Sequence, residues 1–323
     1  MRSMLAGNSV GFRSVRLALM IEGQEGVTWE QWVALASACE EHGVEALFRS
    51  DHYMSGFDEG RPVLDAWATI SGLAAQTTKL ELGTLVSPVT FRHPSVLARC
   101  AATADEISGG RLTLGLGAGW MEREHEAYGF EFRTARERVA RLAEQVEIVH
   151  RLLREDRVDF AGDHYRLLEA PGLRRPRLPI LVGGSAKPGT TGPAVRFADE
   201  YNTFFATLEE VRERKQALDE ACEQAGRDPA TLRYSLMAPC VVGRDERALQ
   251  ESARRVGTRF GRDPQDVLER YGERGPVGTV ERVIEWLKEI EEIGYERVML
   301  QHLAHDDLDT VALIGRELVP AVR

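Results

Sequence analysis

Short apolar runs alternate along the chain with longer segments whose apolar residues recur every three or four positions. Residues 17–21 are continuously apolar, as in a strand buried on both faces. Thr28 and Gln31 then have the spacing of a capping box, which satisfies free amides at a helix start. Gly43 is typical of a helix C-terminus, and between these ends one helical face carries Trp32, Leu35, Ala36 and Cys39. The pattern predicts a buried strand followed by an amphipathic helix.

The same unit recurs along the chain. Strands are predicted at residues 17–21, 46–48, 80–86, 112–116, 180–182, 201–205, 233–242 and 298–301. Helices are predicted between and after them, at about 64–75, 94–107, 134–153, 194–198, from 207, from about 244, over 279–293 and from about 308. Strands that alternate with helices pair in parallel, and eight such units predict a closed (β/α)8 TIM barrel. The rival is an open doubly wound sheet, but the GxGxxG fingerprint expected after its first strand is absent.

One segment breaks this regularity. Residues 158–167 alternate around Ala161-Gly162-Asp163, which predicts a β-hairpin, and a proline-rich stretch follows up to Pro179. Residues 156–178 are too few for a domain, so we expect a small insertion on the barrel rim after the fourth helix. No linker or composition shift marks a second domain, and residues 1–323 are predicted to form one. The rim loops and this insertion are expected to set substrate choice.

Composition narrows the class of protein. The chain has 323 residues, 43% of them hydrophobic, and a net charge of −10, which argues against binding nucleic acid or an anionic membrane. No apolar run approaches the roughly 18 residues of a membrane span. The first 14 residues lack the apolar stretch of a secretory signal and are expected to form a loose tail. Four cysteines without CxxC spacing predict free thiols in a reducing cytoplasm.

Candidate chemistry lies at the carboxyl ends of the strands, where barrel active sites form. His52 follows an acid at the end of the second strand and could exchange a proton near neutral pH, although it could also merely cap the next element. Residues 117–119 and 183–185 are loops of small residues that could let a flat ring or a phosphate approach the backbone, or be ordinary turns.

A metal site is not predicted. Asp51, His52, His302 and His305 lack the converging spacing of metal ligands, and the last two are expected to be solvated rim residues. There is no Walker loop, no GxSxG elbow and no HExxH.

Taken together, several motifs resemble the bacterial luciferase-like superfamily, and within it the branch that uses the deazaflavin coenzyme F420. The most specific is LGTLVSPVTFRHP at residues 82–94, followed by SGGR at 108–111 and GLGAGW at 115–120. SDH at 50–52 and LPILVGG at 178–184 fit the same order.

This resemblance implies roles for the matching positions. His52 would lie beside the reactive centre of the tricyclic ring, and Leu85–Val86 matches a non-proline cis peptide that backs the ring. Residues 117–119 would pass under the cofactor, and residues 183–185 would hold its phosphate. The implied cofactor-binding residues are Asp51, His52, Leu85, Val86, Ser87, Gly117, Ala118, Gly119, Trp120, Gly183, Gly184, Ser185 and Asn202.

The chain also departs from the family. Trp120 stands where the sugar-phosphate dehydrogenases of the family have a catalytic glutamate, and no match to their basic phosphate pocket is evident. We therefore expect an apolar pocket wall, a substrate other than a sugar phosphate, and a catalytic acid supplied by Glu22 or Glu124 from another loop.

The leading hypothesis is hydride transfer between coenzyme F420 and a small organic substrate, with His52 and Glu22 as catalytic residues. The alternative is an FMN-dependent monooxygenase that receives reduced FMN from a separate flavin reductase. A third possibility is a flavin-binding protein without catalysis. The resemblance also implies a homodimer.

Overall fold

The computed structural model describes residues 14–323, so the expectation of a loose N-terminal tail falls almost wholly outside it. The strands are β1 (Arg16–Ile21), β2 (Ala46–Arg49), β3 (Glu81–Thr84), β4 (Ser87–Pro88), β5 (Leu112–Gly117), β6 (Arg157–Ala161), β7 (Arg166–Pro171), β8 (Ile180–Gly183), β9 (Glu200–Phe204), β10 (Arg233–Gly243), β11 (Val277–Thr279) and β12 (Arg297–His302).

The helices alternate with them. They are α1 (Trp29–His42), α2 (Ala66–Gln76), α3 (Pro94–Ser108), α4 (Glu122–Tyr128), α5 (Ala135–Arg154), α6 (Pro188–Phe197), α7 (Leu208–Gln224), α8 (Glu246–Phe260), α9 (Pro264–Gly272), α10 (Val280–Ile293), α11 (Leu308–Leu313) and α12 (Val319–Ala321), with a π-helical turn at Ile314–Leu318.

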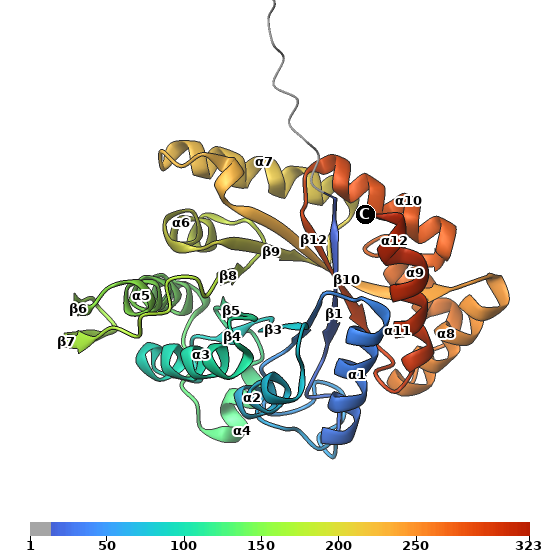
Figure 1. Cartoon of the computed structure of the whole chain (residues 1–323), viewed down its shortest axis with the longest axis horizontal. Helices are drawn as coiled ribbons and strands as arrows, with labels where there is room; N and C mark the ends of the chain where they lie inside the picture. The colour runs from blue at the N-terminus through green and yellow to red at the C-terminus, as the bar shows by residue number, and fades with distance from the viewer. Residues whose placement is uncertain (1–13) are drawn as a thin grey trace, which may run out of the picture.

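A closed parallel barrel forms the centre of the molecule, as the sequence predicts. Its strands follow the order β10-β12-β1-β2-β3-β5-β8-β9, and β9 pairs with β10 to close the ring. Every pairing in the ring is parallel, for example Leu19 opposite Leu300 of β12 and Leu47 of β2. Helices cover the outside of the ring (Figure 1). This arrangement brings the carboxyl ends of all eight barrel strands to one face.

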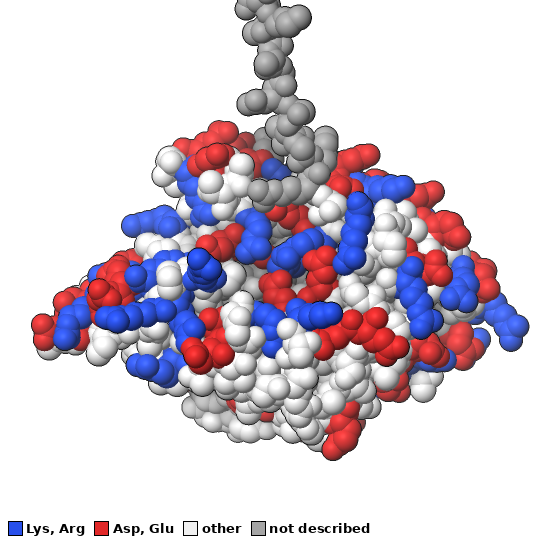
Figure 2. All heavy atoms as spheres, viewed as in Figure 1, with Lys and Arg blue, Asp and Glu red and all other residues white. Residues whose placement is uncertain are grey.

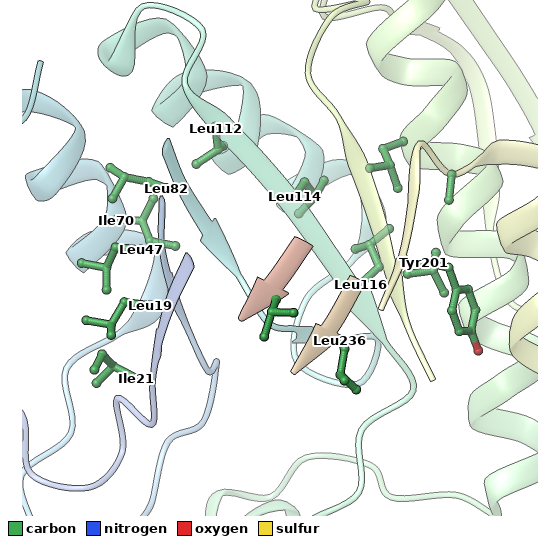
Figure 3. Close-up of a cluster of buried hydrophobic side chains, with 14 of the residues drawn as sticks. Leu19, Ile21, Leu47, Ile70, Leu82, Leu112, Leu114, Leu116, Tyr201 and Leu236 are labelled. Carbon is green, nitrogen blue, oxygen red and sulfur yellow. The ribbon is translucent and has the colours of Figure 1, made fainter. Parts of the chain in front are cut away.

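Alternation along the strands separates two layers of core. Leu17, Leu19 and Ile21 of β1 point outward and pack under the helices. Figure 3 shows Leu19 and Ile21 in this cluster with Ile70 of α2. The intervening Ala18 and Met20 point into the barrel. Successive strand side chains face opposite ways, so a strand covered on both faces is apolar at every position. The inward cluster is Ala18, Met20, Ala46, Phe48, Leu85, Leu181, Met237 and Met299.

Local signals for helix starts are confirmed. Thr28, Thr134 and Thr207 each accept a hydrogen bond in a capping box, and Gly43 caps α1 in the left-handed conformation.

The sequence-based predictions missed α4, α9 and β11. Each of these elements is too short to show a periodic pattern of apolar residues.

The predicted hairpin exists as β6 and β7, but its expected place near the substrate is wrong. It follows α5 and contacts that helix on the periphery of the fold, where Glu144 accepts hydrogen bonds from the backbone of residues 163–165 (Figure 1). No hairpin residue lines either of the cavities described below. Its apolar residues pack on a helix instead, because the chain leaves α5 at the end of the barrel opposite the strand carboxyl ends.

A second excursion, between β10 and α10, contains α8, α9 and β11. β11 adds to the sheet beside β10, with Val241 opposite Val277. Phe260 ends α8 and Arg270 lies near the end of α9. Because this excursion leaves a strand carboxyl end, it reaches the face where barrel sites form.

The remaining features concern the surface and the cysteines. No helix among residues 14–323 is both long and apolar enough to cross a membrane. Acidic and basic side chains are interspersed on the face drawn in Figure 2. All four cysteines are free thiols; Cys39, Cys222 and Cys240 are buried, and Cys100 is half-buried.

Candidate active site

A cavity of about 470 Å³, here called the inner cavity, opens at the carboxyl ends of the barrel strands. Its lining comes from the turns after β1, β2, β5 and β8 and from β9 and β10. Twelve of the fourteen predicted site residues line it: Glu22, His52, Leu85, Val86, Gly117, Ala118, Gly119, Trp120, Gly183, Gly184, Ser185 and Asn202. The topology therefore gathers residues 180 positions apart, from 22 to 202, around one space.

His52 is paired with an acid that is buried behind the cavity wall. Its Nδ1 lies 2.7 Å from Oε1 of Glu124, whose other oxygen accepts a hydrogen bond from the Tyr53 amide at 2.9 Å. Burial by itself lowers the pKa of His52, but the hydrogen bond and charge of Glu124, aided by Glu22 and Asp51, raise it above its ordinary value. Since Nδ1 is engaged, Nε2 is the ring nitrogen left for a ligand.

Glu124 therefore serves His52 rather than the cavity. Its side chain is fully buried in α4 and absent from both cavity linings, which differs from the expectation that it could supply an acid from a loop. Trp120, just before α4, contacts the edge of the His52 ring at a centroid distance of 5.6 Å. Its side chain is 69% exposed, and it forms the wall that the sequence predicts at this position.

The peptide bond between Leu85 and Val86 is cis, as the resemblance implies. It joins β3 to β4 and presents both side chains to the inner cavity. A Cβ at Gly117 would lie 2.3 Å from Cγ2 of Val86, and one at Gly183 would lie 3.0 Å from its Cγ1. These glycines are therefore required for packing against the bulge, a role that loop composition did not reveal.

Residues 183–185 end β8 and lead into α6. Tyr201 holds this turn, because its hydroxyl accepts a hydrogen bond from the Ala186 amide at 3.0 Å and lies 2.6 Å from Thr190 Oγ1. The start of α6 has no side-chain cap. The amides of Gly184, Ala186, Thr190 and Thr191 are already engaged, and Pro188 has no N–H. The amides left to bind an anion such as a phosphate group include those of Ser185 and Gly189.

Asp51 and Ser87 require a correction, because neither lines the inner cavity. Ser87 donates a 2.7 Å hydrogen bond to Oδ2 of Asp51, and Arg92 donates to the same oxygen at 2.6 Å. Both side chains lie behind the wall, where they tie β2 to β4. Asp51 Oδ1 is buried without a hydrogen-bond partner among the described residues.

A second cavity of about 580 Å³, the outer cavity, adjoins the first. Glu22, Trp120 and Phe205 line both. The remaining lining of the outer cavity is Gln24, Glu25, Gly56, Phe57, Met121, Phe260, Arg270, Tyr271, Arg274, Gln301 and Leu303. The excursion after β10 supplies four of these residues, whereas the hairpin supplies none.

Glu22 is held rigidly where the two cavities meet. Gln301 donates to its Oε1 at 2.6 Å and Gln24 donates to its Oε2 at 2.9 Å. Ser50 fixes Gln24 in turn by donating to its Oε1 at 2.5 Å. Glu22 is thus a preorganised carboxylate that lines both cavities.

His302 and His305 are not the solvated rim residues that were expected. They are 5% and 4% exposed. Burial, together with the nearby charge of Arg259, lowers the pKa of His305 to about 3, and its Nε2 lies 2.8 Å from Nη2 of Arg259. They are covered by the excursion after β10, which a strand-by-strand reading of the sequence cannot place. Among residues 14–323 no cluster of three potential metal ligands is present.

Sequence reasoning missed several cavity residues. Phe204, Thr190 and Met237 line the inner cavity, and Arg270 and Arg274 line the outer one. The two arginines lie on and just after α9, a helix that the pattern did not reveal.

The comparisons with known proteins agree with this geometry. The model of the luciferase-like monooxygenase family matches residues 14–275. The chain belongs to this family. The predicted family and barrel are therefore confirmed.

Curated relatives extend over almost the whole chain. An F420-dependent glucose-6-phosphate dehydrogenase of Nakamurella multipartita is 28% identical over 311 residues, which cover 90% of this chain and 91% of the relative. One of Microbacterium testaceum is 28% identical over 313 residues, covering 88% and 90%. A solved F420-dependent secondary alcohol dehydrogenase, in complex with an F420–acetone adduct, has a TM-score of 0.81 at 21% identity, covering 96% of this chain and 99% of that chain. This last likeness shows the fold.

Proposed function

We propose that this luciferase-like protein is an oxidoreductase that transfers a hydride between coenzyme F420 and a small organic substrate. The relatives that extend over most of the chain are F420-dependent dehydrogenases, which supports the deazaflavin over FMN. The inner cavity carries the proposal, because it joins an apolar floor, a protonatable histidine and an uncapped helix start in one space.

The residues present fit a flat ring with a phosphate-bearing side chain. Val86 and Leu85 would lie against the ring, and residues 183–185 would hold the phosphate. The bare backbone at Gly117 and Gly183 keeps this space open, since a Cβ at either position would lie within 3.0 Å of Val86. When bound, the reduced deazaflavin supplies a hydride to an electron-poor C=C, C=N or C=O group, and a proton completes the reduction.

The protein's contribution is positioning and proton control. Glu124 holds His52 through Nδ1 and favours its protonated form, so Nε2 can donate a hydrogen bond to developing negative charge. Glu22 meets the substrate where the two cavities join and can accept or return a proton there. Holding donor and acceptor near contact can supply about 7–11 kcal/mol of the barrier at best.

Two further parts of the proposal concern the protein's setting. The family resemblance supports a homodimer, which light scattering of the purified protein tests directly. The four free thiols support a reducing compartment such as the cytoplasm.

The decisive experiment titrates the purified protein with coenzyme F420 and with oxidised and reduced FMN. We expect F420 to bind at low micromolar concentration or tighter, and FMN at least about tenfold more weakly. In His52→Ala, turnover should fall with any active substrate, whereas His164→Ala on the peripheral hairpin should change nothing. Preference for reduced FMN would instead indicate an oxygenase with a reductase partner, and binding of neither would contradict the proposal.

A further inference from the structure

The outer cavity differs from the inner one in having an aromatic wall and two cations. From this combination we propose that the substrate is an amphipathic anion, with a planar apolar body and a terminal anionic oxygen group. This inference rests on the proposed function for the role of the inner cavity, but it concerns the ligand of the outer cavity. The volume, about 580 Å³, lies within the roughly 300–1,000 Å³ of sites for drug-sized ligands.

The aromatic wall is built from distant parts of the chain. Phe57 follows β2 and contacts Phe260 of the excursion edge-on, at a centroid distance of 4.8 Å. Phe205, Tyr271 and Trp120 complete the lining. Phe57 and Trp120 remain 59% and 69% exposed, so large apolar surfaces face an open space. A planar apolar ligand would remove this surface from water, which is the main gain available in such a cavity.

Two arginines, Arg270 and Arg274, line the same cavity, and neither forms an ion pair within 4.0 Å among residues 14–323. Arg270 forms no ion pair or hydrogen bond among residues 14–323, and the Arg274 side chain makes only a long hydrogen bond, 3.4 Å from Nη1 to the Phe205 carbonyl oxygen. Arg61, by contrast, is 2.5 Å from Glu25 and neutralises that cavity carboxylate. The charge of Arg274 also helps to lower the pKa of Glu210, so that acid compensates Arg274 in part. Together the two guanidiniums still place positive charge at the outer cavity, which suits a carboxylate or phosphate.

The positions of Glu22 and the two arginines determine how the ligand is oriented in the outer cavity. Glu22 lines both cavities, whereas Arg270 and Arg274 line the outer cavity alone. An anionic group would be repelled at Glu22 and attracted at the arginines, so the anionic end points away from the inner cavity. The apolar body then extends along the aromatic wall towards Trp120 and His52, where reduction is proposed to occur.

The polar groups of the cavity offer few partners to the many hydroxyls of a sugar. Gln24 and Gln301 each give one amide N–H to Glu22, and the carboxylate of Glu25 is engaged by Arg61 and Ser55. The buried Oε1 of Gln301 is the acceptor of this set that has no partner among the described residues. Hydroxyl groups placed along the aromatic wall would lose their hydrogen bonds to water without replacement. The body of the substrate is therefore apolar, and the anion is its single strongly polar group.

Calorimetric titration of the full-length protein with matched probes tests this inference, both without cofactor and with saturating F420. The probes are 2-naphthoate, 2-naphthyl phosphate, uncharged 2-naphthylmethanol and glucose 6-phosphate. We expect the two naphthyl anions to bind at least about tenfold more tightly than the alcohol, and their ratio distinguishes a carboxylate from a phosphate site. The double variant R270Q/R274Q should abolish this preference, and raised ionic strength should reduce it. Arg247→Gln, an exposed arginine of α8 outside both cavities, should retain it.

Other outcomes would overturn the inference. Equal affinities for the naphthyl anions and the alcohol would show that the arginines do not bind the anionic group. A higher affinity for glucose 6-phosphate than for the naphthyl anions would show that the body of the substrate is not apolar. Loss of F420 affinity in the double variant, with the naphthoate preference intact, would assign the arginines to the cofactor. If naphthoate binds as expected and F420 does not bind at all, the ligand class stands and only the proposed cofactor fails.

Discussion

At the scale of single residues, the chemistry depends on which side chain stands behind His52. The strand-end position identified His52, and Glu124 was considered only as a possible acid. The structure places Glu124 72 positions away along the chain at 2.7 Å from Nδ1, with its other oxygen on the Tyr53 amide. A buried carboxylate with two partners is a fixed charge, and it holds the imidazole in one orientation.

The first prediction concerns this pair. In Glu124→Gln the charge that raises the pKa of His52 is lost, so the pKa should fall below its wild-type value, as followed by NMR of the imidazole. Because the folded-state pKa is raised, the wild-type pair stabilises the protein most below about pH 6.5 and loses that contribution as pH rises through the folded pKa. Glu126→Gln, an exposed neighbour on α4, is the matched control, and an equal pKa in the two variants would contradict the pairing.

His305 gives a second prediction of opposite sign. Burial and Arg259 lower its pKa to about 3, whereas the unfolded chain binds the proton near pH 6.5. Its neutral form therefore stabilises the fold above pH 6.5, and this contribution falls by up to about 1.4 kcal/mol per pH unit as the pH drops towards 3. In His305→Gln the fall in unfolding free energy between pH 6.5 and 5 should become shallower. The same measurement at pH 8 is the reference, and an unchanged acid slope would show that His305 is not the group responsible.

At the scale of elements, close packing determines which residues contact one another between helices. The hydrophobic pattern locates α1 and a closing helix. It does not reveal that Gly315 in the π-helical turn lies against the last turn of α1. A Cβ at Gly315 would be 2.2 Å from the carbonyl oxygen of His42. Backbone cannot yield as a flexible side chain does, so glycine is required by the neighbouring helix and not by a turn.

Gly315→Ala should accordingly lower the unfolding free energy by about 1–3 kcal/mol, the usual cost of overpacking, as measured by urea denaturation. Gly272→Ala at the end of α9 is the control, because a Cβ there meets nothing within 4 Å. Alanine at Gly272 should be neutral or stabilise the helix by about 0.5–1 kcal/mol. Equal effects of the two substitutions would show that the contact with α1 is relaxed in solution.

At the scale of the whole molecule, a buried ion-pair cluster and the two cavities lie at opposite ends of the barrel. Arg297, Glu81 and Glu200 begin β12, β3 and β9, so they lie at the barrel end opposite the cavities. Arg297 is buried and donates to both Glu81 oxygens at 3.0 and 3.1 Å, with Glu200 3.8 Å away. Burial alone would lower the pKa of Arg297, but Glu200 and Glu81 outweigh it and raise the pKa.

Removing this cation should therefore destabilise the barrel without altering the site. Arg297→Met leaves Glu81 and Glu200 with only their longer ion pairs, to Arg16 at 3.7 Å and to Arg233 at 3.9 Å. We therefore expect a loss of up to about 3–5 kcal/mol in unfolding free energy. Arg323→Met breaks an exposed pair with Glu45 and should cost at most about 1 kcal/mol. F420 affinity of the folded Arg297→Met protein should match wild type. A large loss of affinity at unchanged stability would contradict this separation of the two ends.

The sequence by itself determined the succession of strands and helices, the helix caps and the family motifs. These depend on local periodicity and on residue types within a few positions, which the chain carries wherever it folds. It therefore predicted the barrel and most of the inner cavity, including the loops at residues 117–119 and 183–185.

Only the tertiary structure decided which segments meet across the barrel. It placed Glu124 behind His52, moved Asp51 and Ser87 behind the wall, and buried His302 and His305. It also placed the hairpin on the outside of α5, and it placed α9 with Arg270 and the following Arg274 at the outer cavity. These contacts join residues far apart in the chain, and they are fixed by barrel closure and strand register, for which no local pattern carries a signal.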